Sequence, residues 1–243
     1  MSHKQALVTG GAGFIGSHLA ERLLLEGFDV VVLDDLSVGK RANVPTGARF
    51  IRGDVCSQDD VATALSGSDV VFHLAARVSI RRSVGRFYED AATNIMGTLN
   101  VLRACAREGV QRLVYASSMA VYADAVTQER VSEQHATVPI SPYGVAKLAC
   151  EQYVKLVAAQ TAFDAVAERY FNTNGPRQSA TPYVGVITIF IERLLRGVAP
   201  QIFGDGEQRR DFVHVGDIVD GTYRALVHAE AGQVFNVGSG KGT

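Results

Sequence analysis

The segment of residues 9–16, which reads TGGAGFIG, constrains the fold more than any other part of this chain. It lies between a strand-like apolar run, Gln5–Thr9, and a helical pattern, Phe14–Glu26. Glycines let the chain turn tightly and let the backbone approach a phosphate, while the start of a helix offers free N–H groups and a positive dipole end. The segment therefore predicts a dinucleotide-binding turn with spaced glycines at Gly10, Gly13 and Gly16, and Gly11 gives a second register.

An acidic residue at the end of the next predicted strand narrows the expected ligand. Asp34 closes the run Asp29–Asp34, about 20 residues after the glycine turn, where an acid accepts hydrogen bonds from the adenosine ribose. A carboxylate there repels the additional phosphate of NADP, so the sequence favours NAD. Lys40 and Arg41 follow closely and could bind that phosphate, which keeps NADP as the alternative.

The first two thirds of the chain alternate β-rich apolar runs with longer helical patterns. Runs that are apolar throughout, such as residues 30–33, are typical of parallel strands covered on both faces. The alternation predicts the α/β class with a doubly wound parallel sheet, a Rossmann architecture. The expected strands are Gln5–Thr9, Asp29–Asp34, Phe50–Arg52, Val70–Leu74, Arg112–Ser117 and Ala165–Tyr170, and the expected helices are Phe14–Glu26, Asp59–Leu65, Tyr88–Glu108 and Pro142–Thr161.

The sequence pattern changes after Tyr170. Residues Asn172–Tyr183 are rich in Asn, Gly, Pro, Ser and Thr, which predicts a loop. We therefore expect a dinucleotide-binding domain over residues 1–171 and a smaller substrate lobe over residues 172–243, interleaved with the end of the sheet. Because the chain stops soon after a final strand, we expect that lobe to be incomplete. Its other predicted elements are the helices Val186–Arg196 and Asp217–Ala229 and short strands at Gln201–Phe203 and Asp211–His214.

Composition excludes several classes of function. The 243 residues carry a net charge of −1, so we expect no nucleic-acid partner, because binding a phosphate backbone requires a basic face. The sequence has no signal-peptide pattern and no apolar run long enough to span a membrane, so we expect a cytoplasmic protein without a membrane partner. The six histidines are dispersed, so we expect no metal site. The three scattered cysteines, expected to be buried free thiols, are Cys56, Cys105 and Cys150.

A hydroxyl, a phenol and an ammonium group are predicted to meet at the carboxyl edge of the sheet. Tyr143 and Lys147 lie four residues apart on a helix that Ser141 and Pro142 are suited to begin, so they share one face. An ammonium group beside a phenol lowers the phenol pKa, so Tyr143 could take a proton from a sugar hydroxyl. Ser118 follows a predicted strand that ends at the same edge, and it could orient the substrate oxygen.

Together these motifs resemble those of the extended short-chain dehydrogenase/reductase family. Within that family they resemble the NAD-dependent nucleotide-sugar epimerases of the UDP-glucose 4-epimerase type. The matching stretches run in the family order and cover essentially the whole chain. They are residues 9–16 (TGGAGFIG), 34–37 (DDLS), 53–55 (GDV), 73–76 (HLAA), 94–98 (NIMGT), 117–122 (SSMAVY), 143–147 (YGVAK), 169–172 (RYFN) and 209–215 (RRDFVHV).

The resemblance implies roles for individual residues, with catalysis assigned to Ser118, Tyr143 and Lys147. Asp54 and Val55 would contact the adenine. NAD would be held by Gly10, Gly13, Phe14, Ile15, Gly16, Asp34, Asp35, Ser37, Asp54, Val55, Leu74, Ala75, Ala76, Asn94, Tyr143, Lys147 and Tyr170. Asn94 would help to hold Lys147 and a water, and Tyr170 would lie near the nicotinamide. The nucleotide sugar would contact Ser118, Tyr143, Asn172, Phe203 and Arg210.

The resemblance also implies a reaction. Dehydratases and decarboxylases of the family place acids just after the catalytic hydroxyl, where this chain has Met119 and Ala120, which cannot transfer protons. Ala123 stands where relatives often have glycine. The expected activity is inversion at C4 of a UDP-hexose, of the UDP-glucose/UDP-galactose type, through a transient 4-keto sugar. The alternatives are a nucleotide-sugar reductase or dehydrogenase of the same family and a non-catalytic NAD-binding protein.

The resemblance further implies a homodimer, because relatives pair their two long helices with those of a partner. In this chain these helices are Tyr88–Glu108 and Pro142–Thr161. Relatives also continue beyond a segment like Gly238–Thr243, so the resemblance adds to the expectation that the substrate lobe is incomplete.

Overall fold

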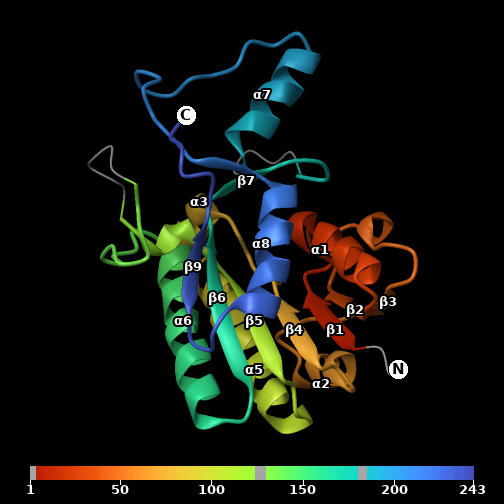
Figure 1. The fold of residues 1–243 in the computed structure, drawn as a ribbon. Coiled ribbons are helices and arrows are strands. Elements are labelled where there is room, and N and C mark those ends of the chain that lie inside the picture. Colours follow the sequence, from red (N-terminus) through yellow and green to blue (C-terminus); the bar gives the residue numbers. More distant parts are fainter. Residues whose placement is uncertain (1–3, 124–129, 180–184) are drawn as a thin grey trace.

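The computed structural model describes residues 4–123, 130–179 and 185–243, and its centre is a sheet of seven parallel strands (Figure 1). The strand order is β3-β2-β1-β4-β5-β6-β9, so the chain begins inside the sheet and winds outward to each edge in turn. This order confirms the predicted doubly wound Rossmann architecture. The strands are β1 (Gln5–Thr9), β2 (Asp29–Asp34), β3 (Arg49–Arg52), β4 (Val70–His73), β5 (Arg112–Ser118), β6 (Asp164–Tyr170) and β9 (Val234–Val237).

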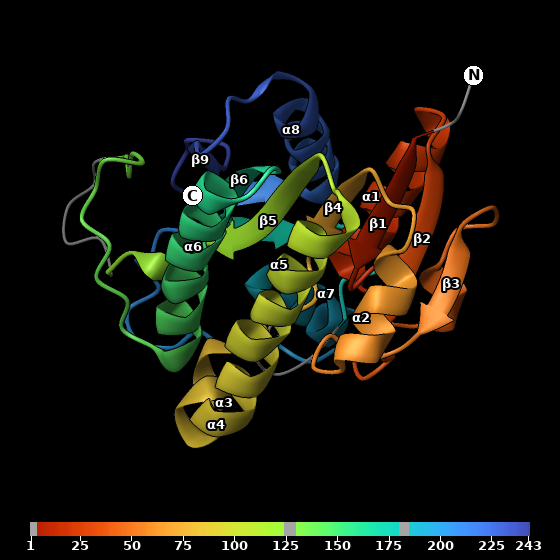
Figure 2. The same ribbon diagram turned by 90° about the horizontal axis from the view of Figure 1, so that it is seen from below.

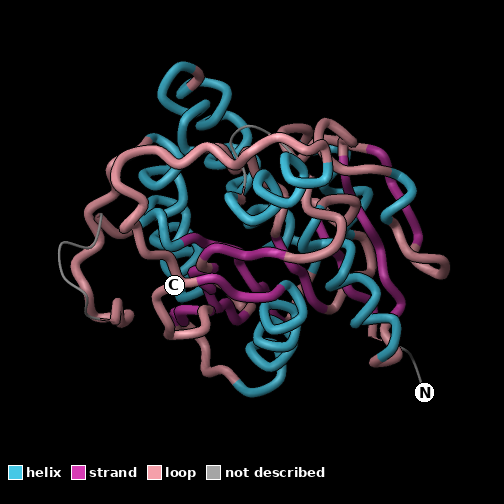
Figure 3. Tube along the Cα trace, turned by 90° about the horizontal axis from the view of Figure 1, so that it is seen from above, coloured by secondary structure: helices cyan, strands magenta, loops and turns pink. Residues whose placement is uncertain are grey.

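Helices cover both faces of the sheet. Figure 2 shows α1 and α8 on one side and α2, α5 and α6 on the other, and Figure 3 shows the strands between helices from above. Each face has its own apolar core, which explains why the central strands are apolar throughout. No helix in the described part of the chain is long and apolar enough to cross a membrane. These helices are α1 (Phe14–Leu25), α2 (Gln58–Leu65), α5 (Gly97–Glu108), α6 (Pro142–Gln160) and α8 (Val215–His228).

The long helix predicted over Tyr88–Glu108 is not uniform. It consists of α4 (Phe87–Ala91), a π-helical segment (Ala92–Met96) and then α5. π-helical turns are rare and frequently mark functional sites. A short helix that the sequence analysis missed, α3 (Ile80–Gly85), precedes them.

The smaller lobe lies above the carboxyl ends of the strands (Figure 1). It contains α7 (Val186–Leu195) and a two-stranded parallel sheet of β7 (Asn172–Asn174) and β8 (Phe212–His214). Ligands of open α/β sheets bind at this edge. Two 3-10 turns complete the described elements, at Arg41–Asn43 and Met119–Val121.

Two expectations about this lobe were wrong. The predicted strand Gln201–Phe203 is irregular and exposed, and it belongs to neither sheet. The first three residues of the predicted loop Asn172–Tyr183 form β7, because pairing with β8 supplies hydrogen bonds that local composition does not reveal. Residues 180–183 of that loop lie outside the described residues.

The cysteines differ in environment. Cys105 and Cys150 are buried free thiols, as predicted. Cys56 is exposed, which corrects its predicted burial, because it lies in the turn after β3 rather than on a helix face toward the core.

A buried histidine connects the ends of β1 and β4 to α5. The His73 ring lies between two hydroxyl groups, with Nδ1 2.7 Å from Thr9 Oγ1 and Nε2 2.9 Å from Thr98 Oγ1. Burial lowers the pKa of His73 to about 3, so the ring is neutral at pH 7. The Thr9 hydroxyl also accepts hydrogen bonds from the backbone N–H groups of Leu74 and Ala75 at 3.2 Å. These contacts fix the segment after β4 beside the glycine turn.

Glu168 is a buried carboxyl group in β6, with an exposed fraction of 1%. The Tyr170 hydroxyl donates to its Oε2 at 3.1 Å and lies 2.7 Å from Thr222 Oγ1 on α8. Burial raises the pKa of Glu168 to about 7.

Replacing Glu168 by glutamine should stabilise the fold above pH 7. The folded-state pKa of about 7 exceeds the ordinary value of 4.5, so the wild type loses stability as pH rises from 4.5 through 7, by about 3 kcal/mol in total. Glutamine keeps a donor and an acceptor and carries no charge. Thermal unfolding should give similar Tm values for E168Q and wild type near pH 4 and a higher Tm for E168Q at pH 8. A Tm difference that is constant with pH would contradict the assignment.

Candidate functional site

The glycine turn forms a cradle that only glycine can build at two positions. Gly10 has a φ of 70°, and a Cβ there would lie 2.8 Å from the backbone nitrogen of Ala75. A Cβ at Gly16 would collide with the carbonyl oxygen of Gly10, because the first turn of α1 packs directly on the loop. The cradle therefore presents bare backbone at a helix start, which fits the pyrophosphate of a dinucleotide.

Asp34 lies at the end of β2, as predicted, and its carboxylate contacts the same turn. Oδ2 accepts a hydrogen bond from the backbone of Ala12 at 3.0 Å, and Oδ1 accepts one from Leu36 at 2.8 Å. Burial raises the pKa of Asp34, and the two backbone bonds act against that rise. Each carboxylate oxygen has a further lone pair, so the group can also accept ribose hydroxyls. Beside it, the Asp35 carboxylate accepts from the backbone and the hydroxyl of Ser37.

The other predicted cofactor residues follow the ends of β3 and β4. Asp54 Oδ1 accepts from the backbone of Cys56 at 2.9 Å, which shapes the turn after β3. Val55 packs against α5, where a Cβ at Gly97 would lie only 2.7 Å from its Cγ2. Leu74, Ala75 and Ala76 follow β4. The structure thus brings the ends of β1 to β4 together around one edge of the sheet, with Phe14 and Ile15 opening α1.

Ser118, Tyr143 and Lys147 lie at the same edge. Ser118 ends β5, and α6 begins as predicted, with Ser141 Oγ accepting from the backbone of Gly144 at 3.1 Å. A Cβ at Gly144 would collide with the carbonyl oxygen of Ala120, so the missing side chain lets α6 approach the turn after Ser118. Tyr143 and Lys147 are both buried, and Lys147 Nζ lies 6.0 Å from the centre of the Tyr143 ring.

Burial controls the protonation of this pair in the protein chain. It raises the pKa of Tyr143 to about 12, while a hydrogen bond with Ser118 lowers it and the charge of Asp90 raises it. Burial lowers the pKa of Lys147 to about 8. The expected lowering of the Tyr143 pKa by Lys147 is therefore not seen in the protein chain, where the pKa is raised. The Lys147 ammonium donates to the carbonyl oxygen of Ala116 at 2.6 Å, and the cost of burying the phenolate dominates.

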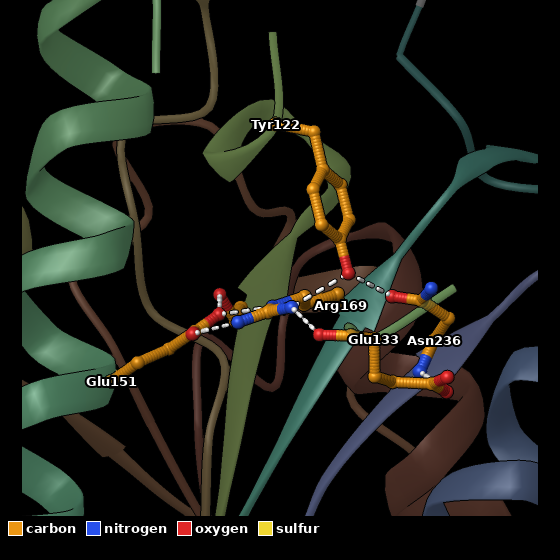
Figure 4. Close-up of polar contacts among 6 residues, drawn as sticks. Tyr122, Glu133, Glu151, Arg169 and Asn236 are labelled. Carbon is orange, nitrogen blue, oxygen red and sulfur yellow. Dashed lines mark hydrogen bonds and ion pairs between the residues drawn. The ribbon is translucent and has the colours of Figure 1, made fainter. Parts of the chain in front are cut away.

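One helical turn beyond Lys147, the buried Glu151 begins a polar network (Figure 4). Its carboxylate accepts two hydrogen bonds from Arg169 on β6, at 2.9 and 2.7 Å, and is also bonded to the hydroxyl of Ser117. Arg169 donates in turn to the Tyr122 hydroxyl at 2.6 Å, and that hydroxyl donates to Asn236 on β9 at 2.9 Å. The network joins β5, α6, β6 and β9 just below the candidate site.

Three predicted residues have partners other than those the resemblance implies. The Asn94 side chain, in the π-helical segment, exchanges two hydrogen bonds with the backbone of Arg77, at 2.9 and 3.0 Å. The Asn94 carbonyl accepts from Thr98 and from the Cys150 thiol, whereas the Lys147 ammonium donates to Ala116. The Tyr170 hydroxyl lies in the core beside Glu168.

The three remaining predicted substrate residues, Asn172, Phe203 and Arg210, lie on the small-lobe side. The Asn172 side chain donates to the carbonyl oxygen of Asp211 at 3.3 Å. Phe203 and Arg210 lie in the exposed segment before β8, where the Arg81 guanidinium stands over the Phe203 ring at 5.9 Å. The backbone of Arg210 exchanges two hydrogen bonds with Thr243, both at 2.9 Å.

The sequence analysis missed two charged residues close to the pair. Glu151 had a detectable signal, because it continues the four-residue spacing of Tyr143 and Lys147 along one helix face. Asp90 had none, because only the packing of α4 against α6 places its charge near the pair.

Replacing Gly16 by alanine should weaken dinucleotide binding by about tenfold or more, because the added methyl group pushes α1 away from the turn, and tenfold corresponds to about 1.4 kcal/mol. Gly85 on α3 is a matched control, since a Cβ there meets nothing within 4 Å. Calorimetric titration with NAD should show the loss for G16A and an unchanged Kd for G85A. Equal affinity of G16A and the wild type would remove the cradle from the cofactor site.

Comparison with known proteins agrees with a dinucleotide-binding site at this edge of the sheet. Residues 6–238 match the family model of the NAD dependent epimerase/dehydratase family. A putative UDP-glucose 4-epimerase of Methanocaldococcus jannaschii is 38% identical over 238 residues, which cover 98% of this chain and 77% of that protein. The crystal structure of UDP-glucose 4-epimerase with UDP-glucose from Thermotoga maritima has a TM-score of 0.94 and 39% identity, covering 98% of this chain and 78% of that chain. The Thermus thermophilus UDP-glucose 4-epimerase in complex with NAD has a TM-score of 0.91 and 40% identity, covering 98% of this chain and 79% of that chain.

Relatives with other reactions are also similar. A UDP-N-acetyl-alpha-D-glucosaminuronate decarboxylase of Bacillus cytotoxicus is 34% identical over 97% of this chain and 75% of its own length. A dTDP-glucose 4,6-dehydratase of Streptomyces niveus is 33% identical over 96% of this chain and 72% of its own length. What these proteins share with the chain is therefore the cofactor fold rather than one reaction. The chain belongs to the NAD-dependent epimerase/dehydratase family of extended short-chain dehydrogenases/reductases, enzymes of nucleotide-sugar metabolism that use NAD.

Proposed function

We propose that this protein is an epimerase that inverts C4 of a UDP-hexose, of the UDP-glucose/UDP-galactose type, through a transient 4-keto sugar. The observation that carries the proposal is that Ser118, Tyr143 and Lys147 lie together at the same edge of the sheet as the glycine cradle. The similar enzymes from Methanocaldococcus jannaschii and Thermotoga maritima bear the name UDP-glucose 4-epimerase, and the latter was solved with UDP-glucose.

The chain itself binds and orients the reactants. Gly10 and Gly16 leave room for the pyrophosphate of NAD, and Asp34 accepts the adenosine ribose hydroxyls. When bound, NAD supplies a hydride acceptor and donor together with a positively charged nicotinamide. On the sugar side, Ser118 hydrogen-bonds O4 and Tyr143 takes the O4 proton, then returns it after the 4-keto sugar has turned over. Lys147 holds the nicotinamide ribose and keeps a positive charge beside the phenolate.

The pKa values of Tyr143 and Lys147 determine what this mechanism requires. A phenol with a pKa of about 12 is neutral at pH 7, so the phenolate needs positive charge beyond that of Lys147. NAD held by these residues would supply that charge. Because the Lys147 pKa is about 8, its ammonium is lost as pH rises through 8, and activity should decline on that side.

The residues after Ser118 favour epimerisation over loss of water. Met119 and Ala120 form the turn that follows β5, and the Ala120 backbone donates to Ser118 Oγ at 3.2 Å. Neither side chain can donate or accept a proton. This turn therefore lacks an acid or base of the kind that elimination at C5 and C6 requires.

Replacing Tyr143 by phenylalanine should reduce the rate of C4 inversion by at least about a hundredfold, the contribution of a general base, and should leave NAD binding intact. NMR of UDP-glucose, UDP-N-acetylglucosamine and UDP-glucuronate incubated with wild type and Y143F reads the C4 configuration directly. Net consumption of added nicotinamide would instead indicate a reductase or dehydrogenase. If the NAD-bound wild type converts none of these sugars, the proposed epimerase activity is wrong.

We also propose a homodimer through the outer surfaces of α5 and α6. Leu102 and Val154 face their own sheet, and Leu99 and Val157 pack partly against it. Four apolar side chains remain exposed beside them: Met96 at the end of the π-helical segment, and Val145, Tyr153 and Leu156 on α6. Adjacent long helices with such exposed side chains are suited to form a four-helix bundle with a second copy.

Replacing Leu156 by glutamate should convert the dimer to a monomer, because the charge would be buried between the helices. Leu156 is 55% exposed, and Leu25 on α1, which is 85% exposed on the other side of the sheet, provides a matched control. Sedimentation at micromolar concentration should give dimers for the wild type and L25E and monomers for L156E. A monomeric wild type would exclude this assembly.

A further inference from the structure

Asp90 is a buried acid that the proposed mechanism does not use. It lies on α4, which packs against α6, and only 3% of its surface is exposed. Among the residues that the structure describes, none donates a hydrogen bond to its Oδ2 atom. Its neighbour Glu89, on the same short helix, is exposed. A buried carboxylate oxygen without a partner is costly, so it calls for an explanation by function.

The charged and polar groups around Asp90 come from four neighbouring parts of the chain. Tyr143 and Lys147 approach from α6, Asn94 from the π-helical segment and Arg77 from the loop after β4. Burial raises the pKa of Asp90, and a hydrogen bond with Asn94 and the charges of Lys147 and Arg77 act against the rise. From α3, Ser83 contributes its hydroxyl, which accepts from the backbone of Tyr143 at 3.3 Å.

A cavity of about 520 Å³ reaches Asp90 from outside. On α6 it is lined by Pro142, Val145 and Ala146, which are the immediate sequence neighbours of Tyr143 and Lys147. Apart from Asp90 and Ser141, the lining is apolar. Water in this cavity therefore contacts the Asp90 side chain without passing through the glycine cradle, while Oδ2 itself is enclosed by protein.

We propose that Asp90 is a positioning residue that sets the charge state of the Tyr143–Lys147 pair, and that water in the cavity keeps its carboxylate ionised while nucleotide and sugar fill the cleft. This inference rests on the proposed function of the pair. The negative charge keeps a proton on Lys147, whose ammonium would otherwise be lost to burial, and it also opposes the formation of the Tyr143 phenolate. The two effects shift both protonation steps in the same direction, toward higher pH.

Replacing Asp90 by asparagine removes the charge and keeps the shape. Both limbs of the pH profile of kcat should then move to lower pH, by roughly half a unit to one unit. E89Q, which neutralises the exposed neighbour, and D90E, which keeps the charge, should retain the wild-type limbs. Unmoved limbs in a folded, NAD-binding D90N would overturn the proposal, whereas loss of activity at every pH without a shift would indicate a structural role alone.

A measurement without turnover separates this inference from the proposed function. In the NAD-bound protein, the ultraviolet absorbance of tyrosinate can be titrated with pH, and subtracting the Y143F titration isolates Tyr143. Its midpoint should be lower in NAD-bound D90N than in the NAD-bound wild type, while E89Q should match the wild type. This result stands even if no UDP-sugar is converted, which would refute only the epimerase activity. If D90N does not fold, D90S provides the same neutralisation with a smaller side chain, and an unchanged midpoint in that variant would reject the role of Asp90.

Discussion

The bidentate ion pair between Glu151 and Arg169 is the interaction on which the catalytic edge depends. Both side chains are buried. Glu151 lies on α6 and Arg169 on β6, so the pair joins these two elements, and Glu151 is also bonded to Ser117 on β5. Leaving one such partner alone in the interior costs roughly 3–5 kcal/mol, so replacing either residue by itself would destabilise the fold. Since Glu151 lies one turn beyond Lys147, the pair also fixes the rotation of α6 about its axis, and hence the direction in which Tyr143 points.

A single physical cause, removal of charged forms from water, organises the electrostatics around this pair. It raises the pKa values of Tyr143 and Asp90 and lowers that of Lys147. The chain alone therefore favours a neutral phenol. By linkage, any ligand that stabilises the phenolate must bind more tightly when that proton has left. In the proposed mechanism, binding of the cofactor and ionisation of Tyr143 are then one coupled equilibrium rather than two separate events.

The sequence was most informative where local geometry decides the structure. The glycine turn, the acid Asp34 and the spacing of Tyr143 and Lys147 are short-range patterns, and the structure places each at the expected edge of the sheet. The alternation in the first two thirds of the chain likewise predicted strands β1 to β6 and their parallel sheet, because apolar runs reflect burial on two faces.

The features that the sequence did not predict depend on contacts between distant parts of the chain. β7 forms from a polar segment because a distant strand supplies its hydrogen bonds, and Ile202 and Phe203 lack such a strand despite their β propensity. Asp90 and Arg169 acquire their importance from groups on other elements, which no local window contains. The raised pKa of Tyr143 is of the same kind, since burial is a property of the whole fold rather than of the spacing to Lys147.

The pairing of β7 with β8 has a consequence for how such a protein diversifies. β7 follows β6 and β8 leads into α8, so the segment between these two paired strands leaves the framework and rejoins it on neighbouring strands. An insertion whose two ends are so close can change length or sequence without straining the framework that carries it. That segment can therefore vary while the sheet stays fixed, and under the proposed function it is where a different sugar preference would arise.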